Sequence, residues 1–225
     1  MTTILLNEIS KNFGSKHVLE QQTLTFSSGQ IYGIVGYNGC GKTVLLKCIC
    51  QLMQTTTGKV QICMDEGEVP VPACGVVIDG ASFIDSYSAF QNLEVLAQIS
   101  GKIGKKEIED VLRRVGLDPA DKKKVKYYSL GMRQRLAIAQ AIIEDPPVLL
   151  LDEPLNGLDC EGIQTVYKII CEEKKKGKVI LVASHHEEDI RLLCDRVYWL
   201  NGGMLKEIEN VEVYTQSKID SIRKD

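Results

Sequence analysis

The stretch "GYNGCGKT", residues 36–43, decides the fold class. It matches G-x-x-x-x-G-K-[ST] at every fixed position, which predicts a phosphate-binding loop. Such a loop needs glycines because backbone N–H groups must approach phosphate oxygens closely. The apolar run 31–35 before it predicts a strand, and 42–53 after it predicts a helix whose positive end faces the phosphates. A glycine-rich turn that matched by chance would lack this order of strand, loop and helix.

Two side chains of the loop carry chemistry of their own. We expect Lys42 to contact the terminal phosphates of a bound nucleotide, and the Thr43 hydroxyl to bind Mg²⁺. The loop's other nucleotide-binding candidates are Gly36, Tyr37, Asn38, Gly39, Cys40, Gly41 and Val44.

Short apolar runs elsewhere in the chain predict strands that are buried on both faces. The clearest are "VLLLD" (148–152), "VILVAS" (179–184) and "RVYWL" (196–200). Such runs are typical of a parallel sheet covered by helices, in which neither face of a strand meets water. The segment up to residue 29 alternates apolar and polar side chains instead, which predicts an antiparallel β flap at the N-terminus.

The middle of the chain has helical spacing. Apolar residues recur every three to four positions over 88–100, 105–117 and 129–145, which predicts amphipathic helices. We therefore expect the whole chain, 1–225, to form a single α/β domain. Its P-loop NTPase core has a mostly parallel sheet and comprises residues 1–85 and 147–225, with an inserted α-helical subdomain over 86–146.

Composition excludes several classes of protein. The net charge of −3 gives no basic signal for nucleic acid, so we expect no nucleic-acid partner. The eight cysteines include no CxxC pair, which favours free thiols in a reducing cytosol over a zinc or redox site. No apolar run approaches the roughly 18 residues that span a bilayer, and the N-terminus has no secretory signal. Any work at a membrane is therefore expected to go through a partner chain.

A pair of acids follows the strand predicted at 148–152. Asp152 and Glu153 would lie at the carboxyl end of that strand, where open α/β sheets place their ligands. Successive strand residues point to opposite sides, so the two acids are expected to differ in role. We assign Asp152 to Mg²⁺ and Glu153 to activating the attacking water as general base. The alternative is a strand end with two solvated acids.

Three further segments carry a family resemblance. The segment "YSLGMRQRLAIAQAI" (128–142) resembles the signature segment of the ATP-binding cassette (ABC) family, with "SLGM" in place of the commoner SGGQ. The stretch "NGLD" (156–159) is similar to the family's D-loop, and "ASHH" (183–186) to the segment that carries its switch histidine. With the phosphate loop and the acid pair, the resemblance covers nearly the whole chain.

The resemblance implies that ATP binds between two cassettes arranged head to tail. Ser129 would cap a helix whose N-terminus faces the γ-phosphate held by the partner, and Gly131 would permit close approach. His185 would contact the γ-phosphate and the attacking water, with His186 as the competing assignment. Asp159 would shape the dimer interface, and Phe13 would stack on adenine. Taken alone, the same residues would be a capped helix and a structural histidine.

One position departs from the common family pattern. The Q-loop glutamine aligns with Asp79, as in bacterial exporter cassettes of the bacitracin-resistance and lantibiotic-immunity type. Gln91 is a poorer candidate because it lies within the helix predicted over 88–100. The nearby apolar residues at 83, 84, 87 and 90 would either receive a short helix from a membrane partner or pack the inserted helices.

Three classes of function are compatible with these motifs. The first, which we favour, is an ATP-hydrolysing subunit that pairs with a second copy or a homologous cassette and powers a separately encoded membrane permease. The resemblance favours export of a peptide, antibiotic or lipid-like compound, from a cytoplasmic position on the inner face of the membrane. The second is a soluble ABC-type ATPase acting on ribosomes, DNA or cofactor assembly. The third, a small-metabolite kinase, leaves the signature and D-loop segments unexplained.

Cys40 has two interpretations. It is either a small residue tolerated in the phosphate loop or a reactive thiol shielded by nucleotide. A helix N-terminus, backbone N–H groups and Lys42 would all favour the thiolate.

Overall fold

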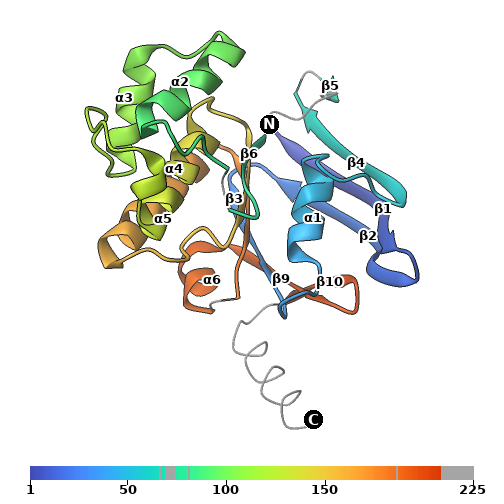
Figure 1. Cartoon of the computed structure of the whole chain (residues 1–225). Coiled ribbons are helices and arrows are strands. Elements are labelled where there is room, and N and C mark those ends of the chain that lie inside the picture. Colours follow the sequence, from blue (N-terminus) through green and yellow to red (C-terminus); the bar gives the residue numbers. More distant parts are fainter. Residues whose placement is uncertain (66, 69–73, 81, 186, 209–225) are drawn as a thin grey trace.

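The computed structural model describes residues 1–65, 67–68, 74–80, 82–185 and 187–208. Its sheets and helices are arranged in layers (Figure 1). The central sheet has the strand order β10-β9-β3-β8-β7-β6 among the described residues. Its strands are β3 (Gln30–Val35), β6 (Cys74–Val77), β7 (Val148–Asp152), β8 (Val179–Ala183), β9 (Arg196–Asn201) and β10 (Met204–Ile208).

Most neighbours in the central sheet are parallel. β3 pairs in parallel with β8 and β9, and β7 pairs in parallel with β6 and β8, whereas β10 is antiparallel to β9. Parallel neighbours require long crossover connections, and helices supply most of them here. The carboxyl ends of β3, β7 and β8 therefore meet at one edge of the sheet.

The second sheet is the antiparallel flap. Its order is β2-β1-β4-β5, with β1 (Thr3–Phe13), β2 (Lys16–Ser27), β4 (Thr57–Met64) and β5 (Gly67–Glu68). The sequence predicted β1 and β2 but missed β4. The Gln22 side chain joins this sheet to the β9–β10 hairpin, because it donates to the Gly203 carbonyl and accepts from the Leu205 N–H, both at 2.8 Å.

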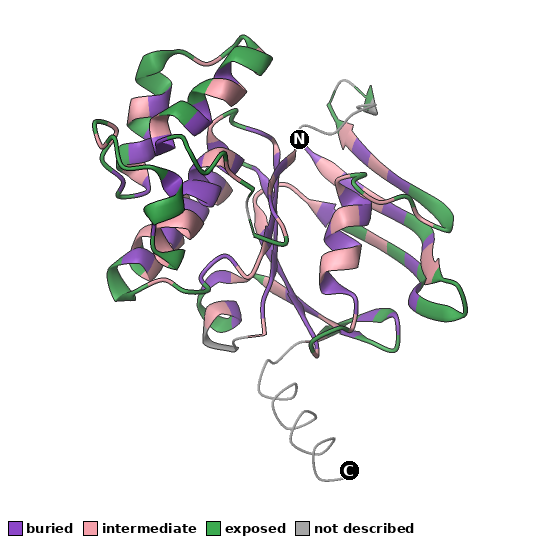
Figure 2. Cartoon of the chain, in the orientation of Figure 1, coloured by how far each residue is buried: buried purple, intermediate pink, exposed green. Residues whose placement is uncertain are grey.

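The helices lie on both sides of the central sheet. Figure 1 shows α2 to α5 gathered on one side, with α1 and the flap on the other. Figure 2 shows that these helices turn buried residues toward the sheet and exposed residues outward. The helical elements are α1 (Lys42–Ile49), α2 (Ala89–Ser100), α3 (Lys105–Arg114), the short 3₁₀ turn η1 (Val125–Tyr127), α4 (Leu130–Ile142), α5 (Cys160–Lys175) and α6 (Glu187–Leu193).

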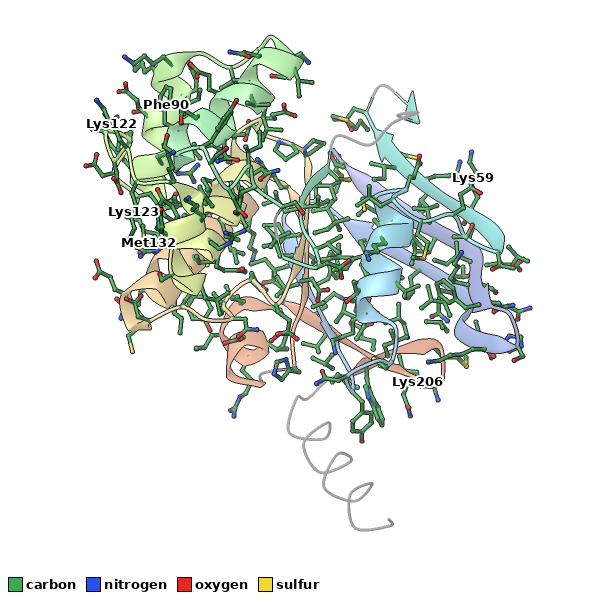
Figure 3. The ribbon with its side chains drawn as sticks, viewed as in Figure 1. Lys59, Phe90, Lys122, Lys123, Met132 and Lys206 are labelled. Atoms are coloured by element: carbon green, nitrogen blue, oxygen red, sulfur yellow. The ribbon has the colours of Figure 1, made fainter. Side chains whose placement is uncertain are left out.

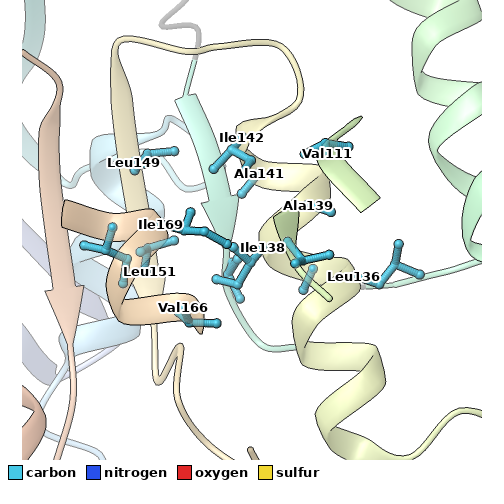
Figure 4. Packing of buried hydrophobic residues seen from close by; sticks show 14 of the residues in the cluster. Val111, Leu136, Ile138, Ala139, Ala141, Ile142, Leu149, Leu151, Val166 and Ile169 are labelled. Atoms are coloured by element: carbon cyan, nitrogen blue, oxygen red, sulfur yellow. The ribbon is translucent and has the colours of Figure 1, made fainter. Parts of the chain in front are cut away.

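Strand β7 explains why the sequence shows an unbroken apolar run. Leu149 and Leu151 pack into the hydrophobic cluster with α4 and α5 (Figure 4), whereas Val148 and Leu150 pack into the cluster with α1 and the flap. Successive side chains of a strand point to opposite faces, so a strand covered on both sides must be apolar at every position. Burying one such side chain fully is favourable by about 1.5–3 kcal/mol.

Helix α4 lies directly against strand β6. A Cβ atom built on Gly75 would lie 1.9 Å from the Ala141 carbonyl oxygen, so only glycine permits this approach. Helix α3 ends at Arg114, three residues before the predicted end, because Gly116 takes a left-handed conformation with φ of 72°. The predicted fold class, a P-loop NTPase core with a β flap and inserted helices, is confirmed.

Candidate functional site: a nucleotide pocket at the carboxyl edge of the sheet

The loop between β3 and α1 folds tightly enough to require its glycines. Gly41 has φ of 111° at the start of α1, a conformation that disfavours any side chain. A Cβ atom on Gly36 would lie 2.6 Å from Cys40 Sγ and 2.7 Å from the Leu200 carbonyl oxygen. Inside this loop the Lys42 ammonium donates to the Gly36 carbonyl at 2.8 Å. The loop is therefore built around the lysine that would meet phosphate.

Asp152 and Thr43 meet because of strand alternation. Asp152 falls on the same face of β7 as Val148 and Leu150, which is the face that packs against α1. Thr43 lies in the first turn of α1, and its hydroxyl donates to Asp152 Oδ2 at 2.5 Å. Burial raises the pKa of Asp152, and the negative charges of Glu153 and Asp79 add to the effect. The arrangement favours a cation or a proton beside this carboxylate.

Glu153 leaves the strand in an unusual backbone conformation. Its φ of 48° lies in the left-handed region, which costs a residue with a Cβ atom roughly 1–2 kcal/mol. Its N–H donates to the Ala183 carbonyl at 2.8 Å, which ties it to the end of β8. The turn directs the Glu153 side chain away from the apolar face that the strand pattern would otherwise give it.

The Glu153 carboxylate is held from the end of β8. Oε1 accepts from the His185 backbone N–H at 3.1 Å and lies 2.6 Å from His185 Nδ1. Oε2 accepts from the Ser184 hydroxyl at 3.3 Å. The two catalytic candidates are therefore in direct contact, which the sequence analysis did not predict, whereas His186 lies outside the described residues.

The phosphate loop and the acids Asp152 and Glu153 border one pocket of about 490 Å³. Phe13 forms part of its wall and is 47% exposed, with the Lys11 ammonium 5.0 Å from its ring centre. Residues from the flap, the phosphate loop and the acid pair therefore line the same pocket. Its lining residues are Phe13, Lys16, Val18, Asn38, Gly39, Gly41, Lys42, Thr43, Val44, Asp152 and Glu153.

Among the predicted site residues that do not line this pocket, three lie at helix starts. The Ser129 hydroxyl accepts from the Met132 N–H at 3.2 Å and caps α4, as predicted. Asp159 caps α5 by accepting from the Gly162 N–H at 2.8 Å, a role within its own subunit that the sequence analysis did not foresee. A Cβ atom on Gly131 would lie 3.0 Å from the Gly157 carbonyl oxygen, so the start of α4 packs closely on the D-loop segment.

Asp79 lies just beyond the carboxyl end of β6. It has φ of 56° and forms an ion pair with Lys47 of α1. Its charge reaches Asp152, where it helps to raise the pKa of that carboxyl. Gln91 has a structural role instead, because its side chain accepts from the Ser88 N–H at 3.0 Å and completes the cap of α2. Gln91 is thus committed to the cap of α2.

The structure bears on the two interpretations of Cys40. Its thiol packs against the hydrophobic cluster beneath the flap and beside Gly36. Burial raises the pKa of Cys40, and this effect outweighs the lowering by Lys42 and the backbone N–H groups. These contacts favour the first interpretation of Cys40, a small residue that packs behind the loop, over a reactive thiolate.

The sequence analysis missed two side chains that serve the site. Ser184 is fully buried, and its hydroxyl lies 3.3 Å from a carboxylate oxygen of Glu153 and 3.3 Å from one of Asp189, so its one hydrogen is shared between two acceptors. Gln134 of α4 donates to the Glu153 carbonyl at 3.2 Å and to the Pro154 carbonyl at 2.9 Å. Their contacts with residues 153 and 154 could not be identified from spacing, because they join segments 19 to 31 residues apart in the chain.

The donor set fits a hard divalent cation that is shared with phosphate. Thr43 and Asp152 offer oxygen atoms side by side, which suits Mg²⁺ when substrate phosphates and water complete its coordination. Within the described part of the chain, no group of three or more His, Cys, Asp and Glu side chains could hold a metal by itself. Among those same residues, no helix has the length and apolar character needed to cross a bilayer.

Comparison with known sequences points to one family. A family model described as ABC transporter matches residues 19–156. An uncharacterized ABC transporter ATP-binding protein of Bacillus subtilis is 40% identical over 206 residues, covering 90% of this chain and 94% of that protein. The bacitracin transport ATP-binding protein of Enterococcus faecalis is 33% identical, covering 90% and 68%. The lantibiotic transport ATP-binding protein of Streptococcus pyogenes is 32% identical, covering 89% and 87%.

Solved structures share the fold. The ATP-binding subunit of an ABC transporter superposes with a TM-score of 0.82 at 22% identity, over 96% of this chain and 93% of that one. A dimeric bacterial ABC transporter cassette superposes with a TM-score of 0.78 at 23% identity, over 92% and 99%.

The half-buried thiol of Cys40 leads to a labelling prediction. At pH 7 we expect iodoacetamide to modify Cys40 more slowly than the exposed Cys160 and Cys171, measured by peptide mass spectrometry. Below its pKa a thiol gains thiolate about tenfold per pH unit, so a raised pKa extends this rise to higher pH. Cys40 labelling that exceeds that of the two exposed cysteines at pH 7 would contradict the assignment.

Proposed function

This chain belongs to the ABC transporter family, and we propose that it is the ATP-hydrolysing subunit of an exporter, acting in a head-to-tail pair of cassettes on a separate membrane permease. The family resemblance drawn from the signature segment is confirmed, and with it ATP binding and the ATPase class. The observation that carries the proposal is the single pocket that unites the phosphate loop with Asp152 and Glu153.

ATP would lie along this pocket from the flap to the acid pair. The backbone N–H groups from Gly36 to Val44 and the Lys42 ammonium would bind its phosphates, after Lys42 releases the loop carbonyls it now contacts. The exposed ring of Phe13, on the pocket wall, would stack on adenine. With adenine on Phe13 and the phosphates in the loop, the terminal phosphate would point toward Asp152 and Glu153.

Mg²⁺ would be held by Thr43 and Asp152 together with phosphate oxygens. When bound, it would neutralise negative charge on the phosphates. Asp152 would serve as an anionic ligand, and its hydroxyl neighbour on α1 fixes the direction in which the carboxylate points. Asp79, at the Q-loop position, would add negative charge beside the same group.

Glu153 would act as the general base. Its carboxylate would accept a proton from water as the water oxygen attacks the γ-phosphorus and ADP departs. His185 contacts that carboxylate and would orient it toward the γ-phosphate. Ser184 holds the second oxygen, which leaves the carboxylate little freedom to rotate.

The second half of the site would come from another cassette. The N-terminus of α4 carries a helix dipole, the Ser129 cap and the close-packed Gly131. Leu130, at the same helix start, is 64% exposed and so would be available for a contact with the second cassette. The partner's γ-phosphate would meet this end, and Asp159 would shape the interface beside it. The fold match to a dimeric cassette is compatible with this arrangement.

A permease would contact the segment before α2. Ile84 and Tyr87 are 43% and 38% exposed, whereas Phe83 and Phe90 pack against the helical cluster. The segment is held in place, because Tyr87 accepts from the Val125 N–H at 2.8 Å and Ile84 accepts and donates backbone bonds with the Asn92 side chain. We treat 86–146 as a helical subdomain inserted between core segments 1–85 and 147–225, with this surface at its border.

Export of a peptide, antibiotic or lipid-like compound is the transport direction we propose. It is supported by the likeness to bacitracin and lantibiotic transport ATP-binding proteins. The cassette would then act at the inner, cytoplasmic face of the membrane. Nucleic acid is not the proposed partner, since the net charge of −3 gives no basic signal. Figure 3 shows Lys122 and Lys123 on the helical side of the molecule and Lys59 and Lys206 away from it.

Glu153→Gln tests the catalytic assignment. We expect ATP binding to persist and phosphate release to fall at least about a hundredfold through loss of the base. ATP should also trap a dimer, which gel filtration would detect. Glu94→Gln, an exposed glutamate on α2, is the matched control and should behave as the unmodified chain. Hydrolysis by Glu153→Gln at a normal rate would show that Glu153 is not the base.

Ile84→Glu tests the permease surface. The new charge should abolish co-purification of the tagged cassette with its integral membrane partner from detergent extracts, because an apolar contact cannot accommodate an unpaired carboxylate. Ile99→Glu on α2, where the side chain is 79% exposed, is the control and should leave co-purification intact. A cassette that sediments with ribosomes or DNA, and never with a membrane protein, would refute the transporter assignment.

A further inference from the structure

Gln134 joins the helix that begins after Ser129 to the strand end that carries Glu153. Its Nε2 amide donates to the Glu153 carbonyl at 3.2 Å and to the Pro154 carbonyl at 2.9 Å. A side-chain amide has two N–H groups, so both are used on this one backbone segment. The proposed steps of hydrolysis assign Gln134 no role, although it is half-buried beside the base.

The segment that Gln134 contacts is held from two sides. On the sheet side, the Glu153 N–H bonds the Ala183 carbonyl, and its carboxylate contacts His185 and Ser184. On the opposite side, the Glu153 carbonyl accepts from the Asn156 N–H at 3.2 Å and from Gln134. A left-handed non-glycine residue persists only where its surroundings enforce it. Gln134 contributes to this from outside the sheet, because its hydrogen bonds hold the carbonyls of residues 153 and 154.

We propose that Gln134 is a positioning residue for Glu153. By holding the carbonyls at 153 and 154, it sets the turn that directs the Glu153 carboxylate into the nucleotide pocket. It acts through Glu153 and does not itself touch the reacting atoms. The inference rests on the proposed role of Glu153 as general base.

The same contact connects the two halves of the composite site. Helix α4 starts at the end proposed to meet the partner's γ-phosphate, and that start packs on the 156–158 segment. A Cβ atom on Gly131 would lie 3.0 Å from the Gly157 carbonyl oxygen, so the backbone of the helix start packs closely on this segment. Any movement of α4 on docking therefore reaches the 153–154 peptide through Gln134. Hydrolysis at the site that contains Glu153 would then depend on whether α4 of the same subunit contacts the γ-phosphate held by the partner.

Gln134→Met tests this role, because it keeps the side-chain length and removes both N–H donors. We expect kcat for ATP hydrolysis to fall about tenfold to a hundredfold, since misplacing a reacting group by about 1 Å can cost a hundredfold. The KM for ATP should change less than about twofold, because the phosphate loop is untouched. Gln140→Met, the same substitution further along α4, is the matched control and should retain normal kcat.

Two additional variants keep the test decisive. Gln134→Glu has the shape of glutamine without its donors and should reproduce the loss of kcat, even if the methionine variant unfolds. In a Glu153→Gln background, Gln134→Met should cause no further loss of residual hydrolysis, because its effect passes through Glu153. A normal kcat for both Gln134 variants, or a full further loss in that background, would overturn the inference.

The outcomes also separate this inference from the proposed function. If Glu153→Gln hydrolyses ATP normally, the proposed base is wrong. If Glu153→Gln is inactive while both Gln134 variants remain fully active, only the positioning role of Gln134 fails.

Discussion

The burial of strand β7 on both faces is the constraint on which the site depends. Four successive apolar residues are covered by helices on one side and by α1 and the flap on the other, so the first polar residue comes only at the end of the strand. Alternation then fixes the direction of Asp152, which faces α1 and meets the hydroxyl of Thr43. The phosphate loop and the acids are brought together by the packing of the core rather than by any contact specific to the ligand.

The next residue requires a different solution. Continued alternation would turn the Glu153 side chain toward the apolar cluster beneath the helices, where burying an unpaired carboxylate is unfavourable. The chain instead takes a left-handed turn, and contacts from the end of β8 and from α4 hold it. The local backbone cost is thus offset by hydrogen bonds that also orient the proposed base. As a result the adjacent acids point in different directions: Asp152 contacts Thr43 of α1, and Glu153 contacts Ser184 and His185 at the end of β8.

The sequence was sufficient for features carried by local pattern. The phosphate loop, the strands at 148–152 and 179–184, and the cap at Ser129 could all be predicted from residue type and spacing. Strand β4 and helix α5 were missed, and so were the partners of Gln134 and Ser184, because these depend on contacts between distant segments. The two interpretations of Cys40 could not be separated from the sequence, because its local neighbours favour a thiolate whereas burial, which raises the pKa of the thiol, depends on the tertiary packing.

The structure of the Glu153→Gln variant with Mg²⁺ and ATP tests the central claim most directly. The account predicts ATP enclosed between the phosphate loop of one subunit and the Ser129–Gly131 helix start of another, with Thr43 and Asp152 on the metal and Phe13 on adenine. Gln134 should still hold the carbonyls at 153 and 154. A complex in which ATP lies in the pocket of a monomer, or in which the start of α4 stays away from every phosphate, would contradict it.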